Sequence, residues 1–372
     1  MSAWQWADQK KPSSISGVRA TVGAVAVTDT PGAEARPYVF VRGLDSHLHL
    51  NWWNGKSWLW SDQGTPSGHS LIESVGAVSV QESKGGAERP YAFVIADDSQ
   101  LYSNFFDGST FLWHGHDAPG GHLVREGVGA LAVQDAGADK QRPYAYVIAD
   151  DFRLWVNFST GTKWEWADLG TPPGHTISRP IGVTTVRDSS TQGTRPYAFV
   201  ITEDSKVWVN MWDGSAFGWG ELGAPPGQLV RKGAGVVTVK DDQTSPERPY
   251  AFVIGYDSQL YSIAWINAKW AWTPHQAPSG RSVLDAVGAV TIADDATSST
   301  RPYVFVTGDD SQMYVHAWIS KKWSWEAHQG PGGPVIERPG AVTYARSGAG
   351  AGQRPYAFVI TSNSSLWSNF WQ

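Results

Sequence analysis

Apolar and polar positions along the chain follow a pattern that repeats every 53 residues. The run Arg-Pro-Tyr-Val-Phe-Val starts at Arg36, and close copies of it follow along the whole chain of 372 residues. The later copies begin at Arg89, Arg142, Arg195, Arg248, Arg301 and Arg354. A period of this length is typical of repeat architectures, in which each unit forms one small supersecondary structure.

Each repeat contains four short apolar runs separated by turn signals. In the second repeat these runs are residues 76–80, 89–95, 101–106 and 111–113. The pair Asp107-Gly108 stands between the last two runs and predicts a two-residue hairpin, because both turn positions require a positive φ. The runs are rich in β-branched and aromatic residues, and none has a helical period, so each repeat is expected to form four antiparallel strands.

Seven such units predict an all-β fold, a seven-bladed β-propeller formed by residues 1–372 as a single domain. The last repeat stops after its third strand, while the N-terminal Trp4-Gln5-Trp6 matches the fourth-strand segment Trp58-Leu59-Trp60. We therefore expect residues 1–20 to complete the seventh blade and close the ring. A linear stack of sheets is the alternative, but it would have no use for this exchange.

Two columns of residues recur at fixed places and are assigned to packing. Glycine recurs in the first strand, expected nearest the axis, at Gly23, Gly76, Gly129, Gly182, Gly235, Gly288 and Gly340. Tryptophan recurs in the fourth strand, expected at the rim, at Trp6, Trp60, Trp113, Trp166, Trp219, Trp272 and Trp325. Large rings would fill the wedge between diverging blades at the rim.

A third aromatic column, at the end of the third strand, is the candidate ligand platform. It contains Trp53, Phe106, Trp212, Trp265, Trp318 and Trp371, with Ser159 in the third blade. A position that accepts Trp, Phe and Ser is a weaker core constraint than a surface position. We expect the third blade, which lacks the ring, to have the weakest site.

Two polar columns complete the candidate site. The arginines of the Arg-Pro-Tyr runs, Arg36, Arg89, Arg142, Arg195, Arg248, Arg301 and Arg354, lie at the hairpin end of each blade and either tie blade ends together or donate to sugar hydroxyls. Asparagine recurs two residues before the platform position and either binds ligand hydroxyls or caps the backbone groups at strand ends through hydrogen bonds. These residues are Asn51, Asn104, Asn157, Asn210 and Asn369.

Composition excludes several classes of function. The net charge is −6 without a block of like charge, so nucleic acid is not an expected partner. There are no cysteines, which excludes disulfides and thiolate metal sites. No apolar run reaches the roughly 18 residues of a membrane span, and the N-terminus has no secretory signal pattern. Action outside the cell would require a non-classical route of release.

No catalytic or metal-binding motif is found, and we expect neither enzyme activity, nor a cofactor, nor a metal. The acidic residues Asp98, Asp151, Asp204, Asp257 and Asp310 repeat in one turn, which favours turn capping. His69, His122 and His175 fall in equivalent loops of different blades and are expected to be exposed. Repeated sites without a singular constellation indicate binding rather than catalysis, and sugars suit aromatic platforms flanked by hydrogen-bonding groups.

The chain resembles the Photorhabdus lectins, a family of seven-bladed propellers. The resemblance rests on the sevenfold Arg-Pro-Tyr-Ala-Phe-Val-Ile run, the Asp-Ser-x-Leu-Trp/Tyr strand and the Trp-x-Trp strand, and it spans the whole chain. It implies binding of L-fucose and related, including O-methylated, saccharides in pockets between blades. It also implies homo-oligomers and contact with fucosylated or O-methylated glycans on host cells.

The sequence thus predicts a multivalent, fucose-preferring lectin. Fungal fucose propellers use a set of Arg, Glu and Trp, but no Glu occurs at the third-strand position judged equivalent here, which is occupied by Leu50, Ser103, Val156, Val209, Ser262, Val315 and Ser368. That chemistry is therefore not transferred. A protein-binding propeller scaffold and, less favoured, a propeller glycosidase are the alternatives.

Overall fold

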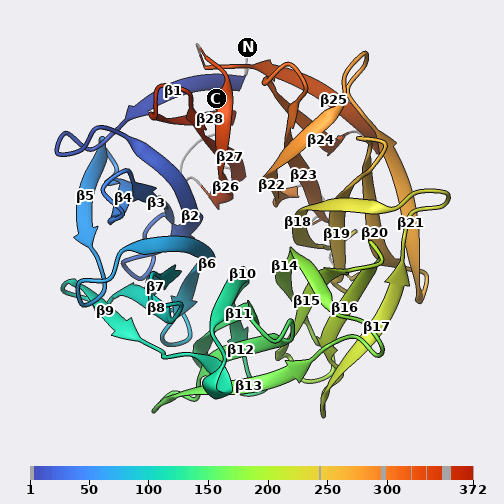
Figure 1. The fold of residues 1–372 in the computed structure, drawn as a ribbon, viewed down its shortest axis with the longest axis horizontal. Coiled ribbons are helices and arrows are strands. Elements are labelled where there is room, and N and C mark those ends of the chain that lie inside the picture. The colour runs from blue at the N-terminus through green and yellow to red at the C-terminus, as the bar shows by residue number, and fades with distance from the viewer. Residues whose placement is uncertain are drawn as a thin grey trace.

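The computed structural model describes residues 4–242, 244–294, 299–319, 321–331, 333–345 and 353–371. These residues form seven four-stranded antiparallel sheets arranged as a wheel, so the predicted seven-bladed propeller is confirmed (Figure 1). Besides the strands, the described residues contain one short 3₁₀ helix, η1 (Pro119–Gly121). No helix among them is long and apolar enough to cross a membrane.

The first four blades run in chain order from the axis to the rim. Blade 1 contains β2 (Val18–Val27), β3 (Arg36–Gly43), β4 (Leu48–Trp53) and β5 (Trp58–Gly64); blade 2 contains β6 (Leu71–Gln81), β7 (Glu88–Ala96), β8 (Leu101–Phe106) and β9 (Phe111–Gly115). Blade 3 contains β10 (Val124–Gln134), β11 (Gln141–Ala149), β12 (Leu154–Ser159) and β13 (Trp164–Gly170); blade 4 contains β14 (Ile177–Arg187), β15 (Thr194–Thr202), β16 (Val207–Trp212) and β17 (Phe217–Gly223).

The next two blades repeat this order, and the seventh takes its outer strand from the N-terminus. Blade 5 contains β18 (Val230–Val239), β19 (Arg248–Gly255), β20 (Leu260–Ile266) and β21 (Lys269–Gln276); blade 6 contains β22 (Val283–Asp294), β23 (Ser299–Gly308), β24 (Met313–Ile319) and β25 (Lys322–Gln329). Blade 7 contains β26 (Val335–Ala345), β27 (Gln353–Thr361), β28 (Leu366–Trp371) and β1 (Trp4–Lys10).

The glycine column lies where the first strands of neighbouring blades approach each other. A Cβ atom on Gly23 would stand 2.8 Å from the backbone nitrogen of Ala77 in the next blade, and one on Gly235 would stand 2.9 Å from that of Ala289. Real Cβ atoms do not come this close to backbone, so only glycine fits. The first strands thereby surround a narrow central opening of about 600 Å³.

The second strands form the centre of each blade and are its most buried part. Their central aromatic residue is fully buried in all seven blades: Phe40, Phe93, Tyr146, Phe199, Phe252, Phe305 and Phe358. Both faces of a blade are covered by neighbours, which explains why these strands are almost continuously apolar rather than alternating. The hydrophobic cores accordingly extend from one blade into the next.

The rim tryptophans fasten each blade to the preceding one. In every blade the indole Nε1 of this column donates a hydrogen bond of 2.7–3.0 Å to a backbone carbonyl of the preceding blade. Trp325, for example, donates to the carbonyl of His275. A partly buried indole needs a hydrogen-bond acceptor for its N–H as well as apolar contacts. Both are present at this position, which explains why it is tryptophan in every blade.

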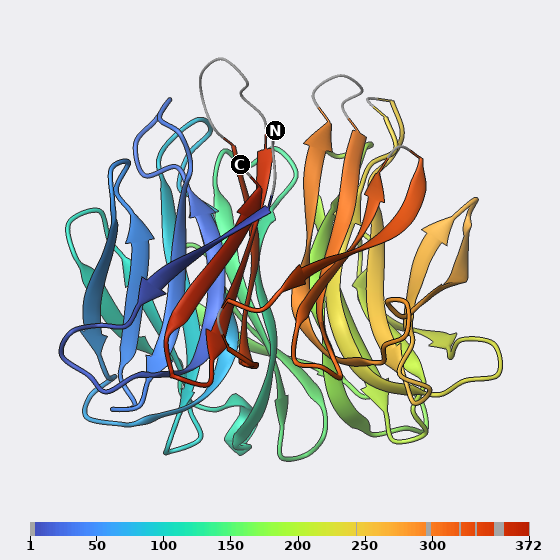
Figure 2. The same ribbon diagram turned by 90° about the horizontal axis from the view of Figure 1, so that it is seen from above.

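The ring closes through strand β1, as the sequence predicts. Trp4 pairs with Trp371 and Trp6 with Asn369 in the antiparallel register of β1 and β28. Trp6 then donates to the carbonyl of His328 in blade 6, so the exchanged strand also carries the contact between blades. Figure 2 shows β1 crossing beside β28, the strand with which it pairs.

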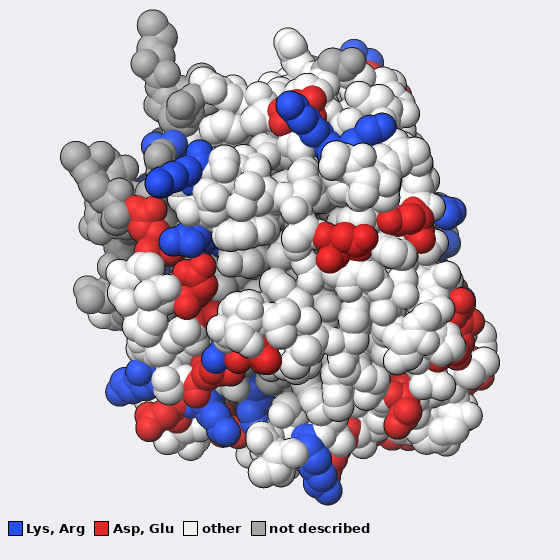
Figure 3. Space-filling model, turned by 90° about the vertical axis from the view of Figure 1, so that its left-hand side faces the viewer, with Lys and Arg blue, Asp and Glu red and all other residues white. Residues whose placement is uncertain are grey.

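The two ends of the wheel have different contents. One end holds the loops between first and second strands and the hairpins between third and fourth strands; we call it the hairpin end. The other holds the turns between second and third strands and the connections between blades; we call it the turn end. Acidic and basic side chains are interspersed on the side formed by blades 1 and 2, without a patch of one sign (Figure 3).

Candidate functional site

Three cavities lie between adjacent blades at the hairpin end and are built from the same residue columns. The cavity between blades 5 and 6 measures about 580 Å³, that between blades 7 and 1 about 370 Å³, and that between blades 4 and 5 about 240 Å³. One blade contributes its platform tryptophan, the first of the two tryptophans in its fourth strand, and its Arg-Pro pair. The preceding blade contributes the tyrosine of its own Arg-Pro-Tyr run.

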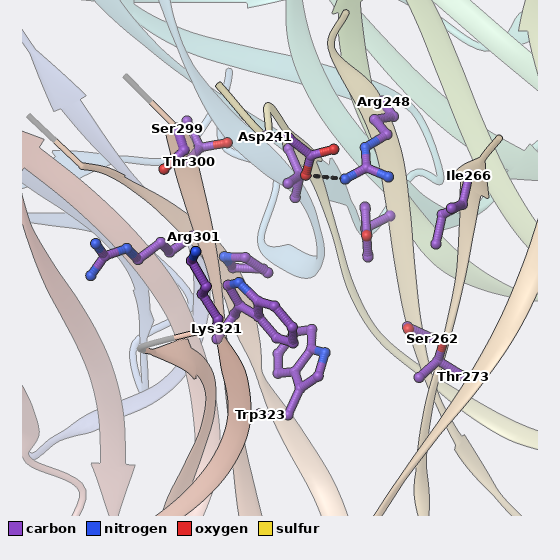
Figure 4. Close-up of a pocket in the computed structure, with 14 residues that line it drawn as sticks. Asp241, Arg248, Ser262, Ile266, Thr273, Ser299, Thr300, Arg301, Lys321 and Trp323 are labelled. Carbon is purple, nitrogen blue, oxygen red and sulfur yellow. Dashed lines mark hydrogen bonds and ion pairs between the residues drawn. The ribbon is translucent and has the colours of Figure 1, made fainter. Parts of the chain in front are cut away.

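The cavity between blades 5 and 6 has an aromatic wall and a polar wall (Figure 4). Trp318 and Trp323 form the aromatic wall, with ring centroids 5.7 Å apart at 67°. Trp318 is 36% exposed, so a face of its ring is available to a ligand. Ser262 and Thr273 line the cavity from blade 5.

Cationic donors outnumber acids in this cavity. Arg248, Arg301 and Lys321 line it, and among the described residues that line it Asp241 is the one carboxylate. Arg248 forms an ion pair with Asp241, drawn as the dashed line in Figure 4, and lies over the ring of Tyr250. The ion pair is exposed at its acidic partner, so its role is to orient the guanidinium rather than to stabilise the fold.

Buried histidines support the aromatic wall from beneath. The ring of His316 stacks on Trp323 at 4.9 Å with an interplanar angle of 8°. His316 Nε2 lies 3.1 Å from His275 Nδ1, and His275 Nε2 lies 2.8 Å from the hydroxyl of Ser262. Burial lowers the pKa of His275 to about 3 and that of His316 to about 4, so both rings are neutral at physiological pH.

The other two cavities vary this plan. Between blades 7 and 1, Trp53, Trp58 and Arg36 face Tyr356 and Phe370. Each cavity again has a single carboxylate among its lining residues: Glu34 between blades 7 and 1, and Glu247 between blades 4 and 5. The paired carboxylates that glycoside hydrolysis requires are therefore missing from the described lining of all three.

Between blades 4 and 5, Trp265, Trp270 and Arg248 face Tyr197 and Met211. Trp265 is 41% exposed, more than any other tryptophan among the exposed large apolar residues of the described chain. Arg248 lines this cavity as well as the one between blades 5 and 6. The two neighbouring cavities thus share one arginine residue.

The structure brings part of the predicted platform column into these cavities. Trp53, Trp265 and Trp318 line them, and each packs its edge against the first tryptophan of the following strand. The remaining members, Phe106, Trp212 and Trp371, are half-buried and make the same contact with Phe111, Phe217 and Trp4. Ser159 is half-buried at the equivalent position.

The arginine column has a structural role and also reaches the cavities. Arg36, Arg89, Arg142, Arg195 and Arg248 each pair with an acidic residue seven positions earlier. Arg142 and Arg354 also donate to the carbonyl of the platform residue of their own blade, at 3.2 Å. Arg36, Arg248, Arg301 and Arg354 line cavities. Both interpretations of this column therefore find support.

The asparagine column does not reach the cavities. Asn51, Asn104, Asn157, Asn210 and Asn369 are 0–1% exposed and line none of the three. Asn51 donates to the carbonyl of Leu59 across its own blade, and Asn369 Oδ1 accepts a hydrogen bond from His328 Nδ1 of the preceding blade at 2.7 Å. This burial favours the structural alternative, so we leave the asparagines out of the proposed site.

Two columns that line the cavities were not among the ligand-binding residues predicted from the sequence. The tyrosines of the Arg-Pro-Tyr runs contribute Tyr197, Tyr250 and Tyr356, and the first fourth-strand tryptophans contribute Trp58, Trp270 and Trp323. Burial raises the pKa of Tyr250, which keeps its hydroxyl protonated. The period-two alternation of the second strand was the available signal, because it places the tyrosine and the buried Phe252 on one face.

Histidine and carboxylate groups that could hold a metal lie at the turn end. His69 and His122 each approach two aspartates of the turns, and Asp45, His47, His49 and Asp62 form a four-residue group in blade 1. His69, His122 and His175 are 26–43% exposed. Asp98, Asp151, Asp257 and Asp310 cap their turns through a backbone N–H two residues later at 3.1 Å, as the sequence predicts.

No protein-family model and no curated protein matches the sequence. The fold is similar to that of the BP39L lectin from Burkholderia pseudomallei, with 17% identity over 94% of this chain and 96% of that chain and a TM-score of 0.65. A fucose-specific lectin from Aleuria aurantia shares 17% identity over 86% of this chain and 99% of that chain, with a TM-score of 0.53. A triple arginine mutant of AofleA from Arthrobotrys oligospora shares 13% identity over 89% of this chain and 91% of that chain, with a TM-score of 0.54. At such identities the likeness shows the propeller fold.

Proposed function

We propose that this chain is a multivalent carbohydrate-binding lectin that recognises L-fucose and related saccharides between its blades. The observation that carries the proposal is the repetition of one cavity, with an aromatic platform, an arginine and a tyrosine, at three blade interfaces of the described structure. A catalytic site is singular, whereas a binding surface gains from repetition.

The chemistry of the cavities suits a saccharide. The apolar C–H face of a pyranose stacks on an indole ring such as that of Trp318, which is exposed for this contact. The guanidinium fork of Arg248 or Arg301 matches vicinal hydroxyls, and the Tyr250 hydroxyl can donate or accept. The small apolar methyl of fucose, or an O-methyl group, would pack against the aromatic wall.

The named function of similar propellers supports the same assignment. BP39L is named as a lectin, and the Aleuria aurantia protein is named as fucose-specific. The preference for fucose, the tolerance of O-methylated sugars and the place among Photorhabdus-type lectins belong to this proposal. So do fucosylated glycans on host cells as partners, homo-oligomers, and action outside the producing cell.

Avidity is the mechanism by which weak single sites become useful. Each cavity is open to solvent and contacts few groups, so a single sugar would bind weakly. Several sites on one rigid wheel engage a glycan-bearing surface together, which raises the affinity by about 10²–10⁴ without a new contact. The indole-to-carbonyl hydrogen bonds between blades keep the sites at fixed spacing.

A glycan array followed by calorimetric titration tests the proposal. We expect signals on fucosylated glycans and binding of methyl α-L-fucoside at more than one site per chain, with methyl α-D-mannoside as the matched control sugar. Signals confined to other glycans would overturn the fucose preference but leave the lectin assignment. A silent array, or turnover of a chromogenic fucoside that one carboxylate substitution abolishes, would contradict the lectin.

A further inference from the structure

Blade 1 departs from the other six blades at the turn end, in the segment that enters β4. His47 and His49 stand where the other blades have different residues. The position of His49 holds Tyr102, Trp155, Trp208, Tyr261, Tyr314 and Trp367 in blades 2–7. In three of these blades the tyrosine hydroxyl donates to the turn aspartate, at 2.6–2.8 Å. A histidine pair here is therefore not required by the propeller.

The two histidines converge on two carboxylates. His47 Nδ1 lies 3.2 Å from Asp62 Oδ1 on the outer strand β5 and 3.8 Å from Asp45 Oδ2 in the turn. His49 Nε2 lies 3.0 Å from Asp45 Oδ2, and His49 Nδ1 lies 4.0 Å from Asp62 Oδ1. One ligand atom from each of the four residues lies within 4.8 Å of the others.

The ring of His49 provides a second, independent indication. It is fully buried, and its Nδ1 has no hydrogen-bond partner. A buried imidazole nitrogen without a partner is unfavourable and requires an explanation. The unpartnered nitrogen is the one that faces Asp62, while Asp45 holds the opposite nitrogen. A metal-bound histidine has this arrangement, with one nitrogen on the metal and the other fixed by a carboxylate.

Space for the group exists because residue 43 is glycine. A Cβ atom there would stand 2.1 Å from Asp45 Oδ1 and 2.9 Å from His49 Nε2. Blades 2, 3, 4 and 7 have Ala96, Ala149, Thr202 and Thr361 at this position.

We propose that blade 1 binds a transition-metal dication of the zinc type through His47, His49 and Asp62, with Asp45 orienting the ring of His49. Zinc bonds to nitrogen and oxygen of about 2.0–2.2 Å place neighbouring ligand atoms at a spacing that small rotations of these side chains can reach. Imidazole ligands favour zinc, copper and nickel, whereas calcium takes six to eight oxygen ligands. The site lies at the end opposite to the saccharide cavities and would tie the turn before β4 to β5.

Titration of the metal-free full-length chain with ZnCl₂ and with CaCl₂ tests this site. We expect one zinc ion per chain, a higher melting temperature with zinc, and no calcium binding. Replacing zinc with Co²⁺ should give the absorption bands of a site with nitrogen and oxygen ligands. These readouts do not depend on saccharide binding.

Two substitutions restore residues that the other blades use, so the fold should tolerate them. His49→Tyr follows Tyr102, Tyr261 and Tyr314, and His47→Gln follows Gln100, Gln259 and Gln312. Each should weaken zinc binding at least about a hundredfold. His122→Ala is the matched control, because His122 approaches Asp150 and Asp151 at 3.1 and 3.5 Å on the surface of blade 3. Unchanged zinc binding in the double variant His47→Gln/His49→Tyr, loss of binding in His122→Ala, or equal binding of calcium would overturn the proposal.

Discussion

The cavity between blades 5 and 6 and the cavity between blades 4 and 5 share Arg248, yet one measures about 580 Å³ and the other about 240 Å³. The two cavities are built from the same platform, arginine and tyrosine columns, and one of their differences lies at a position of the preceding blade. Blade 4 places Met211 there and blade 5 places Ala264. Met211 lines the smaller cavity, whereas Ser262 and Thr273 line the larger one, at positions where blade 4 has Val209 and Gly220.

This comparison separates the residues that form every cavity from the residues that change the size of each one. The platform tryptophan and the arginine recur wherever a cavity is described, so they define the site. The position of Met211 and Ala264 varies freely, with Trp52, Phe105, Phe158, Ala317 and Phe370 in the other blades. A repeat protein can thus hold its fold constant and vary the depth of each site with one side chain.

The shared arginine should give the largest effect. Arg248→Met keeps the apolar stem but removes the guanidinium from both cavities, so titration with methyl α-L-fucoside should show two sites weakened. We expect each to lose about 2 kcal/mol, as for a central polar anchor. Arg301→Met, its matched control, should affect only the site between blades 5 and 6. Equal losses in the two variants would contradict the shared role.

Removing a platform ring should eliminate one site and spare its neighbour. Trp318→Ala and Trp265→Ala should each lower the stoichiometry of fucoside binding by one, because the stacking face is lost. The melting temperature should change little, since these rings are 36% and 41% exposed. Unchanged stoichiometry would remove the platform from the proposed site.

Exchanging the tuning residue should convert one cavity into the other. Ala264→Met is expected to shrink the cavity between blades 5 and 6 and weaken that site roughly tenfold, the scale of a steric mismatch in a binding pocket. Met211→Ala should enlarge the cavity between blades 4 and 5. Crystal structures with bound fucoside would measure both changes. If the sugar position is unchanged in both variants, another residue determines the depth of these cavities.

The last prediction concerns the histidines beneath the larger cavity and the stability of the fold rather than binding. Burial lowers the pKa of His316 to about 4 and of His275 to about 3, from an ordinary value of 6.5. Below about pH 6.5 the unfolded chain takes up protons that the folded chain refuses until about pH 4, so stability falls as the pH falls through this window. Each such histidine contributes a slope of at most about 1.4 kcal/mol per pH unit.

His316→Asn should make this loss shallower. Asparagine occupies the same position in five other blades, so the fold should be retained. Melting temperatures measured between pH 4 and 7.5 would show a smaller decline than in the unmodified chain. Parallel curves for the two proteins would show that His316 does not titrate as its burial implies.

The repeat made most of the fold predictable. Seven near-copies specify the number of blades, and the orphan Trp4-Gln5-Trp6 specifies which strand closes the ring. The sequence also separated rim tryptophans from platform tryptophans, because an invariant column indicates packing and a variable one indicates surface. The structure places those two columns as expected, one between blades and one at the hairpin end.

The residues of the site were less predictable than the fold. The sequence indicates on which face of a strand a side chain lies, but not how far that side chain is from the open end of the blade. Asn51 and Trp53 share a face of β4, but the asparagine lies two residues, or about 7 Å, further from the hairpin. At that depth the neighbouring blade covers it completely. The tyrosine of the Arg-Pro-Tyr run was not among the predicted ligand-binding residues, although it stands close enough to the strand end to reach the cavity. Periodicity gives the face of a strand but not the distance to its covered part.

The pairing of β1 with β28 has a consequence for the order in which the molecule folds. Asn369 bonds to the carbonyl of Gln5, a residue 364 positions away along the chain. Contacts of such separation form late, because the loop that they close must be ordered first. During synthesis β1 emerges before the other 27 described strands, and its partner β28 emerges after them. β1 therefore remains without its partner strand until β28 has been made, and only then can the wheel close.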